Sequence, residues 1–279
     1  MHWQEIEKQS GVAVITGGAS GVGFASAAHL ASKGFRIMLA DVNEIALEQA
    51  ADKLRSSGAD VRTCQTDVAS SASVDTLALQ AFEWGPVTVL MNNAGIAAPT
   101  KTWGKVEDWR RLFDVNLYGI LNGLHAFVPK LLEAGLPAAI INTGSKQGIT
   151  NPPGNPGYNA TKAAVKSLTE HLAHDLRELH APIDVHHFVP GFTYTEMIAS
   201  FMPEKPASAW TSEQTVEYLF ERIASGDFHI LCPDNAVTEE IDAHRVLWNA
   251  QDITENRPAL SRWHTEWIVK FSEREESSK

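Results

Sequence analysis

The stretch Thr16-Gly17-Gly18-Ala19-Ser20-Gly21-Val22-Gly23 decides the fold of this 279-residue chain. It follows a short apolar run, Val12–Ile15, and precedes Phe-Ala-Ser-Ala-Ala-His-Leu, which has helical character. Glycines let the backbone turn tightly and approach a pyrophosphate, which the exposed N–H groups and the positive end of the following helix can hold. Between a strand and a helix, this pattern predicts a dinucleotide-binding loop, with a ligand-free glycine-rich turn as the alternative.

Short apolar runs and longer helical patterns alternate along the rest of the chain. This alternation predicts an α/β fold of the Rossmann type, a single domain in which a doubly wound, seven-stranded parallel sheet carries helices on both faces. We expect its ligand beyond the carboxyl ends of the strands. The expected strands are Val12–Ile15, Arg36–Ala40, Asp60–Cys64, Val87–Met91, Ala138–Asn142, Ile183–Val189 and Phe228–Leu231. The expected helices are Val22–Ser32, Asn43–Ser56, Ser70–Glu83, Val106–Glu133 and Tyr158–His180.

The composition favours a small-molecule ligand. The net charge is -11 and no basic run occurs, so we expect no binding to nucleic acid or to an anionic membrane surface. Cys64 and Cys232 have no metal-type spacing, so we expect reduced thiols and no metal. The first residues lack the pattern of a signal peptide, and no run approaches the ~20 apolar residues of a membrane span. We therefore expect a cytoplasmic protein.

An acidic residue ends the second expected strand. The Asp41 carboxylate could accept hydrogen bonds from the adenosine ribose hydroxyls and would repel a 2′-phosphate. No Lys or Arg lies within Gly17–Gly23 or at Val42 and Asn43, so the usual phosphate clamp is missing. These features predict NAD as the cofactor in preference to NADP. Alternatively, Asp41 could cap the helix that follows.

Tyr158 and Lys162 lie four residues apart, so a helix would project both from one face. A tyrosine hydroxyl titrates near ~10 in water, and an adjacent ammonium group would lower that pKa towards working pH. The tyrosine could then act as a general base. The same spacing is common on solvated helices, so other motifs have to decide between the two readings.

Further motifs follow in order between Gly11 and Leu231, and through them the chain resembles the short-chain dehydrogenase/reductase family. They are Thr16–Gly23, Asp67 in Thr-Asp-Val, Asn92-Asn93-Ala94-Gly95, Asn116 in Asp-Val-Asn-Leu, Ser145 after Ile-Asn-Thr-Gly, Tyr158 with Lys162, and Pro190-Gly191 leading to Thr195. The resemblance implies an NAD-dependent oxidoreductase that interconverts secondary alcohols and ketones by hydride transfer.

The resemblance also implies roles for individual residues. Tyr158 would be the acid/base, and Lys162 would lower its pKa and bind the nicotinamide ribose. Ser145 would hydrogen-bond the substrate oxygen, with Gln147 facing the same space, and Asn116 would hold a water that links Lys162 to solvent. The implied cofactor-binding residues are Gly17, Ser20, Gly21, Val22, Gly23, Asp41, Asp67, Val68, Asn93, Ala94, Gly95, Tyr158, Lys162, Pro190, Gly191, Thr193 and Thr195.

Each of these residues has an ordinary structural alternative. Asn116 could bend a helix, Ser145 could serve a turn, and Pro190-Gly191 could end a strand. Thr193 lies two positions from Thr195, so either could be the threonine that contacts the nicotinamide amide. The ordered combination favours the functional reading over these alternatives.

We expect three segments to shape the substrate site. The loop Pro152–Gly157 would form a stiff wall, and Glu196–Thr211 would form a mobile apolar lid, although ordinary packing explains its apolar residues equally well. The extension 234–279 beyond the catalytic domain, 1–233, is expected to be helical with a disordered end. Its residues Trp248, Trp263 and Trp267 would cap the pocket or bury a helix at an interface, the reading that we favour. The sequence favours a neutral, apolar alcohol or ketone.

Other features leave alternatives open. His171 and His174 are spaced for a metal, but no third ligand completes a site. By resemblance, the helices Val106–Glu133 and Tyr158–His180 suggest a homo-oligomer, a dimer or more specifically a homotetramer. Besides dehydrogenase activity, the fold could serve a non-catalytic NAD-binding sensor or scaffold, or an epimerase or lyase of the same family.

Overall fold

The computed structural model describes residues 2–200 and 202–276. Its centre is a seven-stranded sheet in the order β3-β2-β1-β4-β5-β6-β7, and every paired strand is parallel. The predicted sheet is thereby confirmed, with strand ends that differ from the expected ones by one residue at most. The strands are β1 (Val12–Thr16), β2 (Arg36–Asp41), β3 (Val61–Gln65), β4 (Val87–Asn92), β5 (Ala138–Thr143), β6 (Ile183–Val189) and β7 (His229–Leu231).

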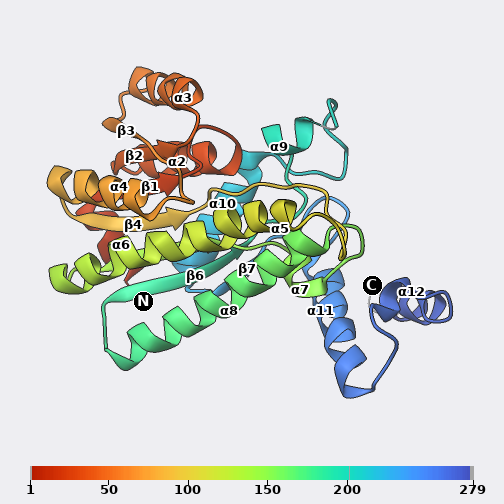
Figure 1. Cartoon of the computed structure of the whole chain (residues 1–279). Helices are drawn as coiled ribbons and strands as arrows, with labels where there is room; N and C mark the ends of the chain where they lie inside the picture. The colour runs from red at the N-terminus through yellow and green to blue at the C-terminus, as the bar shows by residue number, and fades with distance from the viewer. Residues whose placement is uncertain (1, 201, 277–279) are drawn as a thin grey trace.

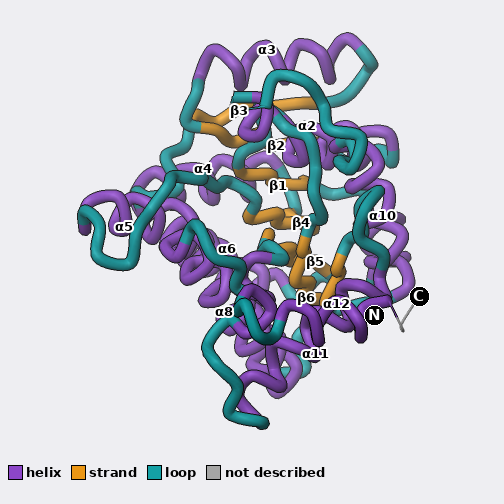
Figure 2. Tube along the Cα trace, turned by 90° about the vertical axis from the view of Figure 1, so that its right-hand side faces the viewer, coloured by secondary structure: helices purple, strands orange, loops and turns teal. Residues whose placement is uncertain are grey.

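Helices cover both faces of the sheet, because side chains of successive strand residues point to opposite faces and most strands are buried throughout. One face packs against α1 (Trp3–Gln9), α2 (Gly21–Ser32), α3 (Glu44–Ser56) and α10 (Ser212–Ser225). The other packs against α4 (Ser71–Trp84), α6 (Gly119–Ala134) and α8 (Pro156–Glu178). Figure 2 shows the two layers, with α2 and α10 on one side of the strands and α4, α6 and α8 on the other.

The expected helix Val106–Glu133 is continuous but changes its winding. It consists of α5 (Val106–Phe113), a π-helical turn at Asp114–Tyr118, and α6. One extra residue in such a turn rotates the following helix and commonly marks a functional site. In the described part of the chain no helix is long and apolar enough to cross a membrane.

Two short helices and the extension complete the fold (Figure 1). α7 (Gln147–Thr150) follows β5, and α9 (Glu196–Ala199) lies between β6 and α10. After β7 come α11 (Glu239–Thr254), a 3-10 turn at Ser261–Trp263, and α12 (Ile268–Glu276).

The end of the chain corrects one expectation. We expected disorder from Ser272 onwards, but α12 continues to Glu276, and 277–279 lie outside the described residues. The buried Phe271 anchors this helix, with its ring centroid 5.2 Å from that of Trp248 and 5.0 Å from that of His244. The aromatic contacts stabilise a terminal segment that its charged sequence alone would leave unfolded.

Candidate active site

The glycine-rich loop connects β1 to α2 and depends on the small size of glycine. Gly17 and Gly21 have φ values of 63° and 53°, in the left-handed region that side chains disfavour. A Cβ on Gly17 would lie 2.8 Å from Ala94 Cα, and one on Gly23 would overlap the carbonyl oxygen of Gly17. Asn93 ties the loop to the end of β4, since its Nδ2 donates to Thr16 O at 3.1 Å.

Asp41 lies at the carboxyl end of β2, beside this loop. Its carboxylate accepts hydrogen bonds from the backbone N–H groups of Ala19 (3.2 Å) and Asn43 (3.0 Å). The residue that caps α3 is Asn43, whose side chain accepts from Ala46 N at 3.2 Å. The alternative that Asp41 caps this helix is therefore wrong.

The catalytic candidates meet where α8 passes the ends of β5 and β6. Tyr158 and Lys162 project from the first turns of α8, and Ser145 follows β5. Ser145 and Tyr158 line the same cavity. Ser145 Oγ accepts from Gln147 N at 3.2 Å, and Lys162 Nζ donates to Thr143 O at 2.8 Å. The helix therefore presents a hydroxyl pair and an ammonium group to one space.

The protonation of the pair differs from our expectation. Burial raises the pKa of Tyr158 above its ordinary value, and only the hydrogen bond from Ser145 acts in the opposite direction. Burial also lowers the pKa of Lys162 to about 8. Lys162 does not lower the pKa of Tyr158 here, because its Nζ is directed to Thr143 O and lies 5.8 Å from the phenol ring centroid.

Asn116 occupies the π-helical turn and is fully buried. Its Oδ1 accepts from Ile96 N at 2.8 Å, and its Nδ2 donates to Ile96 O at 3.0 Å and to Thr161 Oγ1 at 3.3 Å. Asn116 does not line the main cavity but approaches Lys162 across Gly95, because a Cβ on Gly95 would be 3.4 Å from Asn116 Oδ1 and 3.8 Å from Lys162 Nζ. It thus fixes the loop after β4 behind the lysine.

A cavity of about 460 Å³ joins the loop to the catalytic group. Most predicted site residues line it, and they are Gly17, Ser20, Gly21, Val22, Asp41, Asn93, Ala94, Gly95, Ser145, Gln147, Tyr158, Lys162, Pro190, Gly191, Thr193 and Thr195. Asp67 and Val68 line an adjoining cavity of about 540 Å³ that shares Gly17 and Asp41. Gly23 lines neither cavity, since it packs against Gly17.

The two neighbouring threonines have different surroundings. Thr193 is buried, and its Oγ1 lies 2.9 Å from Thr215 Oγ1 and donates to Gly191 O at 3.2 Å. Thr195 approaches the glycine-rich loop, where a Cβ on Gly21 would be 3.1 Å from its Cγ2. Thr195 is therefore the better candidate for a contact with the cofactor.

The substrate side differs from the expected arrangement. None of Pro152–Gly157 is among the described residues lining the cavity, because α7 takes that position with Gln147. Within the expected lid, Met197 and its neighbour Ile198 line the cavity, and Phe201 lies outside the described residues. Thr143 and Gly144 of the motif before Ser145 also line the cavity, and the lining residues without a sequence signal are Lys146, Phe192, Asp234, Val237 and Arg245.

The tryptophans of the extension pack within the extension itself. Trp248 is buried, and its Nε1 donates to Ser261 Oγ at 2.8 Å. Trp267 packs edge-on to Trp248, with ring centroids 6.3 Å apart. Neither these two nor Trp263 is among the described residues that line the cavity, where the extension contributes Asp234, Val237 and Arg245.

The predicted histidine features have local partners. His174 Nδ1 lies 2.9 Å from Arg177 Nη2, and His187 Nδ1 on β6 lies 3.0 Å from His229 Nδ1. Among residues 2–200 and 202–276, no group of three or more His, Cys, Asp or Glu side chains is arranged to hold a metal ion.

The site suits a dinucleotide. The two adjoining cavities run from the loop, where a side chain on Gly17 or Gly23 would collide with backbone, to the hydroxyl pair of Ser145 and Tyr158. A pyrophosphate fits the loop, and a ring beyond it would reach the catalytic end. Fold and site together define a dinucleotide-dependent oxidoreductase.

The chain belongs to the short-chain dehydrogenase/reductase family, because the family model described as short chain dehydrogenase matches residues 11–206. It is 35% identical over 188 residues to a CLA biosynthesis dehydrogenase/reductase of Lactiplantibacillus plantarum, covering 67% of this chain and 66% of that protein. It is 31% identical over 247 residues to a 1-deoxy-11-beta-hydroxypentalenate dehydrogenase of Streptomyces avermitilis, covering 86% and 91% of the two chains.

A solved structure extends the likeness. A short-chain dehydrogenase/reductase from Burkholderia phymatum in complex with NAD has a TM-score of 0.81 and 35% identity, covering 88% of this chain and 95% of that one. The predicted family, fold and reaction class are thus confirmed, and the chain is an oxidoreductase that acts on CH–OH groups with a nicotinamide cofactor.

Proposed function

We propose that this enzyme interconverts a secondary alcohol and a ketone with NAD, using Tyr158 as the acid/base. The observation that carries the proposal is that the hydroxyl side chains of Ser145 and Tyr158 line the same cavity as the glycine-rich loop. Such a hydroxyl pair can bind one oxygen and exchange a proton with it. The nicotinamide, when bound, supplies the hydride acceptor or donor.

The surrounding residues prepare this proton transfer. Ser145 holds the substrate oxygen beside the Tyr158 hydroxyl, and a phenolate there is stabilised when the Lys162 ammonium turns from Thr143 O towards it. Lys162 also offers donors to the nicotinamide ribose. Asn116 positions the loop at Ile96. We propose that Asn116 also binds the water that links Lys162 to solvent.

NAD is the proposed cofactor in preference to NADP. The Asp41 carboxylate stands beside the loop and would repel a 2′-phosphate. Two arginines, Arg110 and Arg111, line the adjoining cavity, but Glu107 and Asp114 line it with them. The NAD complex of the Burkholderia phymatum structure agrees with this assignment.

The substrate is proposed to be an apolar alcohol or ketone. Phe192, Met197, Ile198 and Val237 line the cavity with apolar side chains. The name of the 1-deoxy-11-beta-hydroxypentalenate dehydrogenase indicates a substrate that carries a hydroxyl group, which agrees with this class. The identity of the substrate inside the class is left to experiment.

Two further proposals concern the setting of the enzyme. A cytoplasmic location is favoured by Cys64 and Cys232, which are both free thiols. A homo-oligomer, either a dimer or a tetramer, is proposed through the surface of α5, α6 and α8, where Val106, Tyr118 and Leu132 are exposed.

The decisive experiment measures NADH formation from a panel of aryl, cyclic and aliphatic secondary alcohols. It compares the wild type with Tyr158→Phe and NAD with NADP. We expect turnover with NAD that falls at least ~10³-fold in the variant, since a positioned acid/base contributes factors of this order. NAD binding should be unchanged.

Two other outcomes would change the assignment. NAD binding without turnover on any alcohol or ketone would favour a sensor or scaffold. Turnover of a substrate without net NADH formation would favour an epimerase or lyase.

A further inference from the structure

The helix α11 of the extension contacts both ends of the short helix α7. At the first end, the Lys146 ammonium lies 2.5 Å from Asp242 Oδ2. At the other end, Asn249 Nδ2 donates to Ile149 O at 3.1 Å. Asp242 and Asn249 are seven residues apart in α11, two helical turns, so both lie on one face of the helix. That face spans α7 from end to end.

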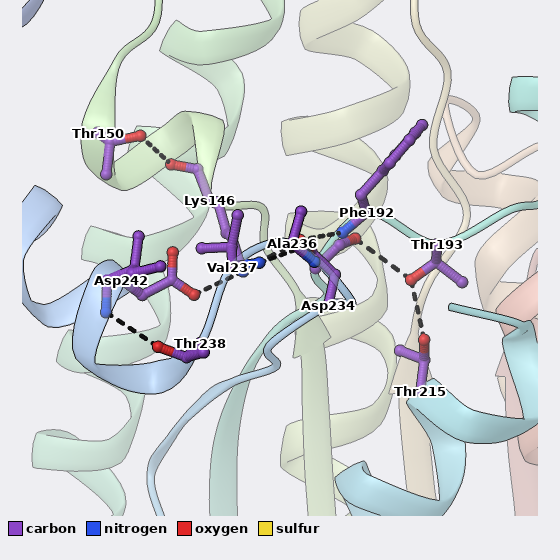
Figure 3. A network of polar contacts seen from close by, with 12 residues as sticks. Lys146, Thr150, Phe192, Thr193, Thr215, Asp234, Ala236, Val237, Thr238 and Asp242 are labelled. Atoms are coloured by element: carbon purple, nitrogen blue, oxygen red, sulfur yellow. Dashed lines mark hydrogen bonds and ion pairs between the residues drawn. The ribbon is translucent and has the colours of Figure 1, made fainter. Parts of the chain in front are cut away.

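The contact at Lys146 is a buried charge network (Figure 3). The side chains of Asp242 and Asp234 are only 3% and 5% exposed, and Asp234 Oδ2 lies 3.6 Å from the same ammonium group. Asp234 also accepts hydrogen bonds from the N–H groups of Phe192 (3.1 Å) and Val237 (2.9 Å). Lys146 therefore connects the extension to the substrate wall at Phe192.

Lys146 is also adjacent to the catalytic serine. Ser145 precedes it, and Ser145 Oγ accepts from the N–H of Gln147, the first residue of α7. α7 in turn rests on α8, because a Cβ on Gly148 would lie 2.6 Å from the carbonyl oxygen of Lys162. A shift of α7 would therefore move Ser145 relative to Tyr158 and Lys162.

The extension has the internal support to hold α11 in place. Trp248 Nε1 donates to Ser261 Oγ, and Ser261 N donates to Asp252 Oδ2 at 3.0 Å. The Arg257 guanidinium carbon lies 4.3 Å from the Trp248 ring centroid and 5.2 Å from that of Trp267. These contacts hold α11 to the rest of the extension.

We infer that α11 positions the catalytic serine: Asp242 and Asn249 hold the two ends of α7 and thereby set the place of Ser145 against Tyr158. The inference rests on the proposed function, since it assigns Ser145 to the substrate oxygen. Asp242 and Asn249 are positioning residues that touch neither substrate nor cofactor. The extension is thus part of the catalytic apparatus.

The test compares Asp242→Asn, Asn249→Ala and the double variant in the full-length protein. We expect kcat to fall about 10-fold in each single variant and about 100-fold in the double, because small misplacements of reacting groups cost factors of this size. The dissociation constant of NAD, measured by protein fluorescence, should stay within about 2-fold, because neither Asp242 nor Asn249 is among the described residues that line the cavity.

Two controls separate positioning from general damage. Glu240→Gln makes the same chemical change as Asp242→Asn on an exposed carboxylate of the same helix, and it should leave kcat unchanged. If Asp242→Asn unfolds, Asn249→Ala keeps the inference testable, because it removes only a neutral hydrogen bond to Ile149 O and leaves the buried charges in place. That variant should fold, bind NAD and show the lowered kcat.

Several results would overturn the inference. They are an unchanged kcat in the folded Asp242 and Asn249 variants, a loss confined to NAD affinity, or an equal loss in Glu240→Gln. Failure of the proposed function looks different, because the wild type itself would then give no NADH with any alcohol while still binding NAD.

Discussion

The two ends of the active-site cavity are formed by different parts of the chain, backbone atoms at the nucleotide end and side chains at the substrate end. At the nucleotide end, backbone atoms of β1, β4 and the glycine-rich loop approach so closely that Gly17 and Gly23 leave no room for side chains. At the substrate end, side chains from distant segments meet, as Lys146 meets Asp234 and Asp242. The backbone end fixes a ligand common to many enzymes, whereas the side-chain end can change residue by residue. The difference explains how one cofactor site can serve many substrates.

The largest expected effect comes from placing a side chain in the backbone end. Gly23→Ala should lower NAD affinity at least ~100-fold and destabilise the fold by about 1–3 kcal/mol, because its Cβ overlaps Gly17 O. Isothermal titration with NAD and urea unfolding measure the two effects.

Gly58→Ala is the matched control for this change. Gly58 has a φ of 89° and nothing within 4 Å of its built Cβ, so the variant should lose stability through backbone strain alone. Normal NAD affinity in Gly23→Ala would mean that the loop accommodates a side chain and that the contrast between the two ends is false.

The second prediction concerns Lys162, where the two ends meet. Its pKa of about 8 lies below the ordinary 10.5, so the unfolded chain binds more protons between these values. Stability relative to Lys162→Met should therefore rise with pH across this window, by roughly 3 kcal/mol in total, and stay at its lower level below pH 8. Urea unfolding at several pH values measures the difference. A difference that is flat from pH 8 to 10.5 would contradict the buried, low-pKa lysine.

The third prediction tests the side chain to which we assign the proposed choice of NAD over NADP. Asp41→Ala should reduce the preference for NAD over NADP by about 10-fold or more, since removing the carboxylate ends its repulsion of a 2′-phosphate. The ratio of kcat/KM values for the two cofactors reports the change. An unaltered ratio would move the source of the preference elsewhere, with Arg110 and Arg111 as the next residues to vary.

The smallest effect is expected at the apolar substrate wall. Met197 is 39% exposed and lines the cavity, so Met197→Ala should change relative kcat/KM values among bulky and small alcohols by only about 3-fold to 10-fold. NAD affinity should not change. A loss of NAD binding in this variant would show that the two ends are not separable.

The same division explains what the sequence could predict. Apolar runs and glycine spacing are local, so all seven strands and the loop were placed correctly, and most predicted site residues line one of the two adjoining cavities. Lys146 and Asp242 are far apart in the sequence, and neither carries a local signal of the ion pair that joins them. The π-helical turn at Asn116 was also missed, because it leaves the helical periodicity almost unchanged.

The electrostatic expectation failed for a related reason. Spacing placed Lys162 on the same helix as Tyr158 but could not show that Thr143 O would receive its ammonium group at 2.8 Å. Burial, which raises the pKa of Tyr158, depends on the whole fold. Sequence patterns therefore predict which side chains come together better than they predict the pKa values of those side chains.

The place of α11 in the chain has a consequence for biosynthesis. The nucleotide-binding loop and β1 to β4 leave the ribosome first, while Asp242 and Asn249 follow some 150 residues after β4. On our inference, a nascent chain can form the dinucleotide-binding cleft before Ser145 is correctly positioned against Tyr158. Hydride chemistry would therefore be switched on only after α11 has been made, which protects a partly made enzyme from turning over its cofactor.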